Sequence, residues 1–398
     1  MTLRLRHAVA AAAVLALVLT GTATAAPTTK TYRVGPIEVG PYQVRQNDYD
    51  IGIPKPAEDA YISAMEVDIV DAKGSKVPIS RLMLHHIVFT NVGAEFGEKR
   101  DHTCQQFTQL DSRTRIPAWG ERFYAAGEER AKMLLPEGYG YESKGADRWA
   151  MTWMMMNHRS KTDRAYIEYT VKYDTKPQKP VTPYWLDVKN CLFDPIYDVP
   201  GGRKKGSTHR KSYNWKVPES GRIVAGGGHV HGGAKDLSIN RRRCELYASK
   251  PTWGSAKHPF YRVRPVLHEP GPINMSGFTS SKGFGVRRGE TIRLDSDYDA
   301  RLLHTRVMGI FVLYMAKGDS SEGAKGCAKP KDLNDYGSPV RGRRKAPRFK
   351  VPIIGIKNGK AREISKPRGA RKRMASGGSI EVGDQFFSTP NVLSLIHI

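Results

Sequence analysis

The chain has 398 residues and a formal net charge of +25, from 64 Lys and Arg against 39 Asp and Glu. Beyond a short leader, about 370 residues remain, which is enough for two domains of ordinary size. No RNA- or DNA-reading motif accompanies the positive charge, so we expect no specific nucleic-acid partner. The sequence also lacks a GxSxG nucleophile motif, a Walker loop and a dinucleotide fingerprint, which argues against the enzyme classes built on them.

The first 25 residues predict a secretory signal peptide. Arg4 and Arg6 precede an apolar run from Ala8 to Leu19, and Ala23-Thr-Ala25 has the small-residue pattern of a cleavage site. No other apolar run approaches the ~20 residues of a membrane-spanning helix, and no Cys follows the leader to carry a lipid anchor. We therefore expect a soluble protein that is secreted to the extracellular space and has no transmembrane anchor.

Short stretches rich in Val, Ile, Tyr, Thr and Met alternate with Gly, Pro, Asn and Asp, which is typical of strands joined by turns. The one modest helical candidate covers residues 119–134. The segments that we expect to form strands are Tyr61–Val70, Leu82–Thr90, Trp149–Met156, Arg164–Tyr173, Gly221–Ala225, Lys235–Ile239, Thr291–Leu294 and Thr305–Met315. This pattern predicts an all-β fold of antiparallel sandwich or jelly-roll type.

Two composition changes predict where this β fold divides. Residues 173–183 are rich in proline and lack apolar periodicity, and after Met315 the chain turns to Gly, Ser, Lys and Arg. We expect a β-sandwich over residues 28–178, a second over 179–318, and a basic, low-order extension over 319–398. The excess charge of this extension favours contact with acidic surfaces.

Four cysteines follow the leader, and they are Cys104, Cys191, Cys244 and Cys327. Their spacings are too wide for a CxxC zinc motif. In an oxidising compartment they would form two structural disulfides, for which three pairings are possible.

Two histidine pairs, His85-His86 and His229-Val-His231, lie in segments that we expect to be strands. Residues i and i+2 of a strand share a face, so His229 and His231 suit one metal ion, whereas His85 and His86 do so only if their strand twists, bulges or ends. The alternative is that both pairs are surface or hydrogen-bonded histidines.

Two later side chains would complete three-ligand sites. His158 follows an apolar run and would otherwise close a strand, and Met308 would otherwise lie in the core. Because imidazole suits copper and a thioether favours Cu(I), the combined set points to a redox copper protein.

Five segments in this order resemble the copper type II, ascorbate-dependent monooxygenases, the family of peptidylglycine α-hydroxylating monooxygenase and dopamine β-monooxygenase. The resemblance extends from about Tyr49 to Met315. The segments that carry it are Ile51–Pro54 with Ala57–Met65, Leu84–Phe89, Phe123–His158, residues 229–232 and Val307–Met315.

The resemblance implies two β-sandwich domains with one copper ion in each, across a solvent-filled cleft. His85, His86 and His158 would hold the electron-transfer copper. His229, His231 and Met308 would be the catalytic ligands, holding the copper that binds O2. The implied function is a secreted dicopper monooxygenase, an oxidoreductase that hydroxylates a C–H bond of an organic substrate with O2 and ascorbate.

The chain departs from this family at several points. Gly227, Ile310 and Val312 stand where the peptide-hydroxylating branch has its carboxylate-binding Arg, Asn and Tyr, so a glycine-extended peptide is not the expected substrate. The resemblance suggests a Cys191–Cys327 bridge and an inserted basic loop over residues 197–220.

Two other hypotheses belong to different classes. The first is a secreted copper-binding protein that sequesters or delivers the metal without turnover. The second is a cell-surface binding module that acts through the basic tail, with vestigial histidines.

Overall fold

The structure is a computed structural model that describes residues 26–95, 97–104, 107–108, 117–118, 120–191, 195–255, 257–263, 269–337, 353–357 and 360–364. The predicted signal peptide and most of the basic extension lie outside these residues. Strands dominate the described chain, and the prediction of an all-β fold is confirmed. The described part holds no α-helix, and its two short 3-10 helices are η1 (Pro259–Arg262) and η2 (Ser320–Glu322). None of its helices is long and apolar enough to span a membrane.

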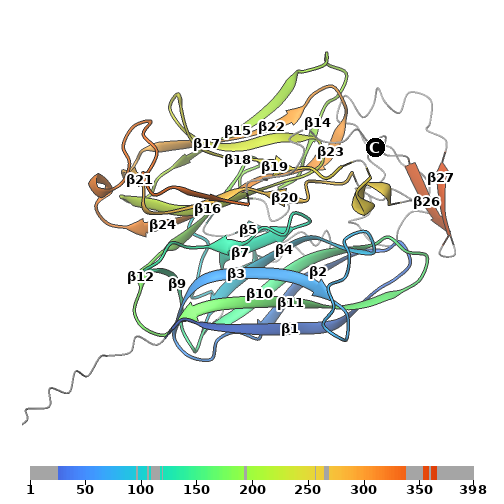
Figure 1. Ribbon diagram of the computed structural model, residues 1–398, viewed down its shortest axis with the longest axis horizontal. Coiled ribbons are helices and arrows are strands. Elements are labelled where there is room, and N and C mark those ends of the chain that lie inside the picture. Colours follow the sequence, from blue (N-terminus) through green and yellow to red (C-terminus); the bar gives the residue numbers. More distant parts are fainter. Residues whose placement is uncertain are drawn as a thin grey trace, which may run out of the picture.

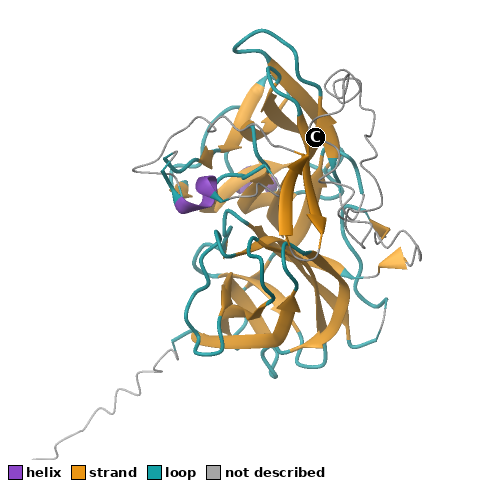
Figure 2. Ribbon diagram, turned by 90° about the vertical axis from the view of Figure 1, so that its right-hand side faces the viewer, coloured by secondary structure: helices purple, strands orange, loops and turns teal. Residues whose placement is uncertain are grey.

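Four sheets lie in stacked layers, two built by the N-terminal part of the chain and two by the C-terminal part (Figures 1 and 2). The outer N-terminal sheet has the order β1 (Thr28–Val39), β11 (Asp163–Asp174), β3 (Ala60–Val70), β9 (Tyr139–Ser143) and β12 (Lys179–Pro180), with β8 (Met133–Leu134) also paired to β3. The inner N-terminal sheet has the order β2 (Val44–Ile53), β10 (Arg148–Asn157), β4 (Leu82–Gly93) and β7 (Glu121–Gly127).

The C-terminal part repeats this arrangement. Its inner sheet has the order β13 (Thr182–Asp187), β24 (Gly309–Lys317), β16 (Gly221–Val230), β21 (Gly277–Val286) and β25 (Asn334–Tyr336). Its outer sheet has the order β15 (Thr208–Lys216), β22 (Thr291–Asp299), β17 (Ala234–Arg241) and β18 (Cys244–Ser249). Four small ribbons pair β5 (Phe107–Thr108) with β6 (Pro117–Ala118), β14 (Tyr197–Val199) with β23 (His304–Val307), β19 (Pro251–Thr252) with β20 (Asn274–Met275), and β26 (Ile353–Lys357) with β27 (Lys360–Ile364).

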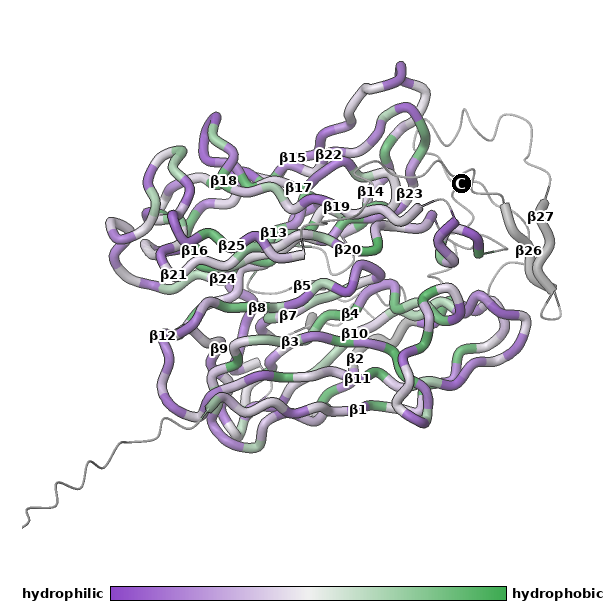
Figure 3. The backbone as a smooth tube through the Cα atoms, in the orientation of Figure 1, coloured by the Kyte–Doolittle hydropathy of each residue, from purple (hydrophilic) through white to green (hydrophobic). Residues whose placement is uncertain are grey.

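The two inner sheets face each other, and β24 shows how they pack. Successive side chains of a strand point to opposite faces. Ile310, Val312 and Tyr314 pack with the N-terminal core, whereas Phe311 and Leu313 pack between the two C-terminal sheets. Both faces of β24 are therefore buried, which explains its nearly continuous apolar sequence and the green stretch along it in Figure 3.

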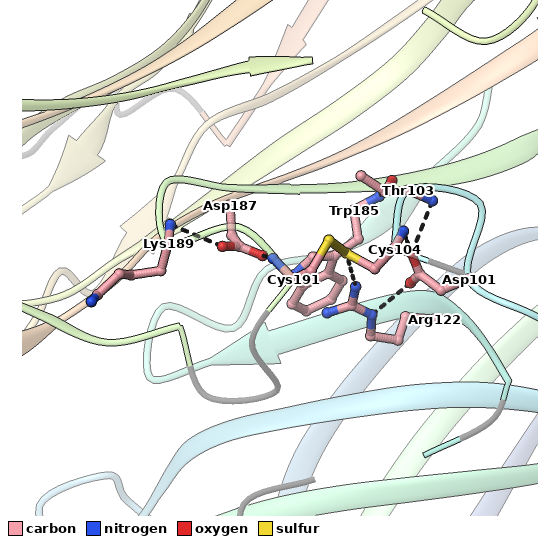
Figure 4. Close-up of a disulfide and its surroundings, with 8 residues drawn as sticks. All are labelled: Asp101, Thr103, Cys104, Arg122, Trp185, Asp187, Lys189 and Cys191. Carbon is pink, nitrogen blue, oxygen red and sulfur yellow. Dashed lines mark hydrogen bonds and ion pairs between the residues drawn. A yellow bond between two sulfur atoms is a disulfide. The ribbon is translucent and has the colours of Figure 1, made fainter. Parts of the chain in front are cut away.

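The N-terminal and C-terminal sheets are also joined covalently. Cys104 bonds to Cys191 and Cys244 bonds to Cys327, so the Cys191–Cys327 bridge suggested by the family resemblance is wrong. Cys104 precedes β5 and Cys191 follows β13, so this disulfide connects the two parts of the chain (Figure 4). The guanidinium of Arg122 lies beside the bridge, 4.4 Å from the centroid of the Trp185 ring, and donates to Asp101.

Two local expectations are wrong for reasons of tertiary packing. The helix expected over residues 119–134 is absent from the described part of this range, where residues 121–127 and 133–134 form β7 and β8. Phe123 stacks on Tyr141 of β9 with ring centroids 4.7 Å apart, and β7 pairs with β4. The basic segment 197–220 is not a loop insertion but contains β14 and β15. Since β15 is an edge strand with mostly exposed side chains, its Lys and Arg residues suit the position that it occupies.

Candidate functional site

Four histidines from two distant segments of the sequence meet where the inner sheets face each other. His85 and His86 lie on β4, in the inner N-terminal sheet, and His229 lies on β16 with His231 directly after it. The rings of His85 and His231 are in edge contact, with centroids 4.8 Å apart. The structure therefore unites the two histidine motifs in one cluster, although the sequence assigns them to separate sites.

Within each pair the ring nitrogens are close enough to share a proton. Nδ1 of His85 lies 3.2 Å from Nδ1 of His86, and Nε2 of His229 lies 3.1 Å from Nε2 of His231. The i, i+2 spacing of His229 and His231 accounts for the second contact, since both lie on one face of the strand. The first contact requires a departure from regular alternation, and β4 is irregular beside His86, where its register with β10 shifts.

Hydrogen bonds beyond the pairs assign the protons of His229 and His231. Nδ1 of His231 lies 2.9 Å from the carbonyl oxygen of Arg306, which can only accept, so this nitrogen carries a proton. Nε2 of His231 and Nε2 of His229 share one proton. Nδ1 of His229, 3.0 Å from Oε2 of Glu129, then shares one proton with that carboxyl group. The buried Glu129 thus orients the His229 ring, while its Oε1 accepts from the amide of Gly127.

Glycines make room for this cluster. A Cβ atom on Gly127 would lie 2.7 Å from Cε1 of His229 and 2.8 Å from the carbonyl oxygen of His85. Gly232 and Gly233 follow the second motif, and Cβ atoms there would meet Glu269 at 2.4 Å and the His304 ring at 2.1 Å. The glycines around the histidines therefore allow close approach of backbone to side chain.

A pocket adjoins the cluster between the two inner sheets. Its empty volume is about 720 Å³, part of it open to solvent. His86, His229 and Met308 lie on its wall, and most of the remaining lining is apolar. The apolar and aromatic lining side chains include Val88, Tyr124, Ala125, Trp185, Ile310, Val312 and Tyr314. The pocket thus combines apolar walls with imidazole groups, which is the usual composition of a small-molecule site.

His158 does not belong to the cluster. It follows β10 and its amide donates to the carbonyl of Arg81, whereas His86 pairs with Met154 in the same ladder. His158 lies four positions beyond Met154 along the extended chain, a distance of about 13 Å. Both ring nitrogens of His158 are buried without a hydrogen-bond partner, and burial lowers the pKa of the ring to about 4.

The residues do not fit two copper sites. The proposed first site is broken because His158 stands apart from His85 and His86. The two sites would also have to lie across a cleft, whereas His85 and His231 touch. Across the part of the chain that the structure describes, no group of three or more His, Cys, Asp or Glu side chains is placed to hold a metal ion.

Sequence reasoning missed Glu129, which contacts His229, and its buried neighbour Glu128. Glu128 and Glu129 follow β7 and are both about 1% exposed. Burial, reinforced by the neighbouring Glu129, raises the pKa of Glu128 well above its ordinary value and favours its protonated form. The signal in the sequence was the Gly127-Glu-Glu129 triplet, which directly follows an apolar stretch. Adjacent acidic residues are usually exposed in a turn, so their position beside an apolar strand was the only hint of a special role.

Comparison with known families gives one match. The family described as stress up-regulated Nod 19 matches residues 154–318, less than half of the chain, which includes His158, the second histidine motif and Met308. No curated protein matches the chain.

Solved structures give weak likenesses. A peptide-N(4)-(N-acetyl-β-D-glucosaminyl)asparagine amidase is 10% identical over 73% of this chain and 98% of its own, with a TM-score of 0.35. PNGase F, a glycosylasparaginase from Flavobacterium meningosepticum, is 9% identical over 77% and 99%, with a TM-score of 0.33. A structure of Sulfolobus turreted icosahedral virus is 8% identical over 72% and 90%, with a TM-score of 0.31. At these scores the likenesses carry no argument about function.

The assignment to the copper monooxygenases is therefore wrong. The family that matches is a different one, no curated protein matches, and the histidines do not form the two copper sites. Three expectations rested on that assignment and are wrong with it: the oxidoreductase activity, the two copper ions and the use of ascorbate. The alternative of a copper-sequestering protein has no support either.

Proposed function

We propose that this protein binds a small, largely apolar molecule that carries one hydrogen-bonding group, in the pocket between its inner sheets. The observation that carries the proposal is the composition of the pocket wall, which is mostly apolar and aromatic and carries the imidazoles of His86 and His229, with Lys132 and Thr152 as further polar lining residues. Transfer of an apolar ligand from water to these walls would lower the free energy of the system. Its polar group would lie against the imidazoles, because the rest of the lining offers few hydrogen-bonding partners.

The Glu129–His229–His231 chain supports this polar end of the pocket. A histidine held by a carboxylate keeps a fixed ring orientation, so a ligand does not have to order it. Of the residues singled out from the sequence, we propose that His86, His229 and Met308 contact the ligand. His85 and His231 position the ring of their partner in each pair.

We further propose that residues 28–178 and 179–318 are two β-sandwich domains and that the mature chain is secreted. The division is supported by the sheets, since strand pairs run within each part, with two exceptions. β12 pairs with β9, and β25, which lies beyond residue 318, pairs with β21. Secretion is supported by the predicted signal peptide, with which the two disulfides are consistent. Sequencing of the N-terminus of exported protein tests both the cleavage site and the localisation.

The binding proposal is tested with a fluorescent apolar amine, 1-aminoanthracene, whose emission rises in an apolar site. The chain has six tryptophans and Trp185 lies on the pocket wall, so the part of the tryptophan quenching that is lost in Trp185→Phe reports binding at this place. Ala125→Phe fills the pocket and should weaken binding of the probe at least tenfold. Ala64→Phe is the matched control, since Ala64 is equally half-buried on β3 but does not line the pocket.

Two results would contradict the proposal. One is probe binding that leaves Trp185 fluorescence unchanged in the wild-type protein. The other is equal loss of binding in the Ala125 and Ala64 variants while both retain the thermal midpoint of the parent.

A further inference from the structure

A strongly basic groove lies away from the pocket, at the edge of the C-terminal sheets. Arg242, Arg287, Arg288 and Lys325 line it, and we call these four residues the basic groove. All four are exposed, and among the described residues none forms a salt bridge with them. The groove encloses about 1660 Å³ of space, part of it open to solvent.

Two tight turns and one crossing segment bring these charges together. Arg242 lies in the turn between β17 and β18, where Arg241 pairs with Cys244. Its φ of 53° is a conformation that Gly or Asn adopts more readily than Arg. Arg287 and Arg288 lie in the turn between β21 and β22, which is closed by a hydrogen bond from the amide of Glu290 to the carbonyl of Arg287.

The buried Arg241 holds the three segments in place. One of its terminal nitrogens donates to the carbonyl of Gly326 at 3.0 Å, and the other donates to the carbonyl of Gly285. Its Nε lies 2.5 Å from Oε1 of Glu290. The one carboxylate among the lining residues is thus engaged by Arg241, so no lining carboxylate is left to form a salt bridge with Arg242, Arg287 or Arg288. The Cys244–Cys327 disulfide fixes the segment that carries Lys325.

The lining also discriminates between classes of polyanion. It contains no aromatic side chain on which a nucleic-acid base would stack and no large apolar side chain that would enter a membrane. It consists of Arg, Lys, Gly, Ser, Thr, Glu and the disulfide. Arginine guanidinium groups match the geometry of carboxylate and sulfate by paired hydrogen bonds.

We propose that the basic groove binds an acidic polysaccharide through its carboxylate or sulfate groups. The disulfide on its rim suits an oxidising compartment outside the cytosol, where such polymers are found. This proposal does not depend on the pocket or on the basic segment beyond residue 337.

The test measures binding of alginate and dextran sulfate to the full chain as a function of salt. The triple variant Arg242→Ser, Arg287→Ser, Arg288→Ser should bind at least tenfold more weakly at low salt. The slope of the logarithm of the association constant against the logarithm of the salt concentration should also become shallower by about two to three, because fewer counterions are released when three cations are lost. The matched control is Arg203→Ser, Lys204→Ser, Lys205→Ser, which removes the same charge from an exposed loop elsewhere.

Three outcomes would overturn the proposal. Equal weakening in the two triple variants would show a general effect of charge. Unchanged binding in the groove variant would place the site elsewhere. Binding of single-stranded DNA or anionic lipid vesicles that depends on the three arginines more strongly than alginate binding does would assign the groove to another polyanion. Equal thermal midpoints of the variants and the parent exclude unfolding as the cause.

Discussion

At the scale of the residue, His158 shows what burial does to a side chain that sequence patterns offer as a metal ligand. It is 9% exposed, and both of its ring nitrogens lack partners. A neutral ring tolerates such a place better than a charged one, which is why its pKa falls to about 4. Burial of His158 therefore makes the free energy of unfolding depend on pH.

We predict that His158→Leu flattens the acid limb of the stability profile. The folded state keeps the ring neutral down to about pH 4, whereas the unfolded chain takes up a proton near pH 6.5. The unfolded state therefore binds more protons between these values, and stability falls as pH drops through this window. The expected contribution is about 2–3 kcal/mol between pH 7.5 and pH 4.5. Urea denaturation of both proteins at the two pH values measures it, and identical losses would contradict the assignment.

The histidine cluster illustrates a different lesson at this scale. The position of the His229 ring depends on Glu129 and on the absence of a side chain on Gly127, and neither residue lies near His229 in the sequence. The residue types of the motif were visible in the sequence. Their partners were not, because they come from the facing sheet.

At the scale of the element, β24 serves two environments at once. The face with Ile310 and Val312 borders the pocket, and the face with Phe311 and Leu313 fills the C-terminal core. Neighbouring residues of one strand should therefore respond differently to the same kind of truncation.

We predict that Leu313→Ala and Val312→Ala separate stability from binding. Leu313 is fully buried, and its truncation should lower the free energy of unfolding by about 2–5 kcal/mol. Val312 is 9% exposed on the pocket wall, so its truncation should cost about 1 kcal/mol or less and should change the affinity for 1-aminoanthracene. Denaturation curves and probe titrations of both variants measure this. A larger loss of stability in the Val312 variant would contradict the assigned faces.

At the scale of the whole molecule, the Cys104–Cys191 disulfide ties together sheets that also share an apolar interface. Its sequence separation is 87 residues, and it crosses the segment where the sequence predicts a domain boundary. Tyr314 of β24 donates to the carbonyl of Phe123 of β7 across the same interface. We expect the two parts to unfold together rather than one after the other.

We predict that the double variant Cys104→Ala, Cys191→Ala lowers the free energy of unfolding by about 2–5 kcal/mol, because the unfolded chain gains freedom when a loop of this length is opened. Denaturation followed by Trp fluorescence and by circular dichroism measures the loss and its cooperativity. The variant Cys244→Ala, Cys327→Ala, with a loop of similar length, is the control for loss of a disulfide as such. Transitions of the two probes that separate in the parent protein would contradict joint unfolding.

Local patterns in the sequence were sufficient to predict the all-β class and the position of most strands. Alternation of apolar and polar residues, as in Tyr61–Val70 and Arg164–Tyr173, is a local property that survives in any fold that buries one face of a strand. The sequence also marked the histidine motifs and the glycines around them. Local patterns gave wrong predictions where tertiary packing determines the structure. The two cases are the helix expected over residues 119–134 and the loop expected where strand β15 lies.

Only the tertiary structure decided which of these residues meet. The pairing of Cys104 with Cys191, the contact of His85 with His231 and the separation of His158 from both depend on how four sheets stack. Such contacts join residues that are far apart in the chain, and a histidine motif carries no record of the sheet that will face it. For the same reason, the basic groove appeared only when two turns and the segment bearing Lys325 were brought together around the buried Arg241.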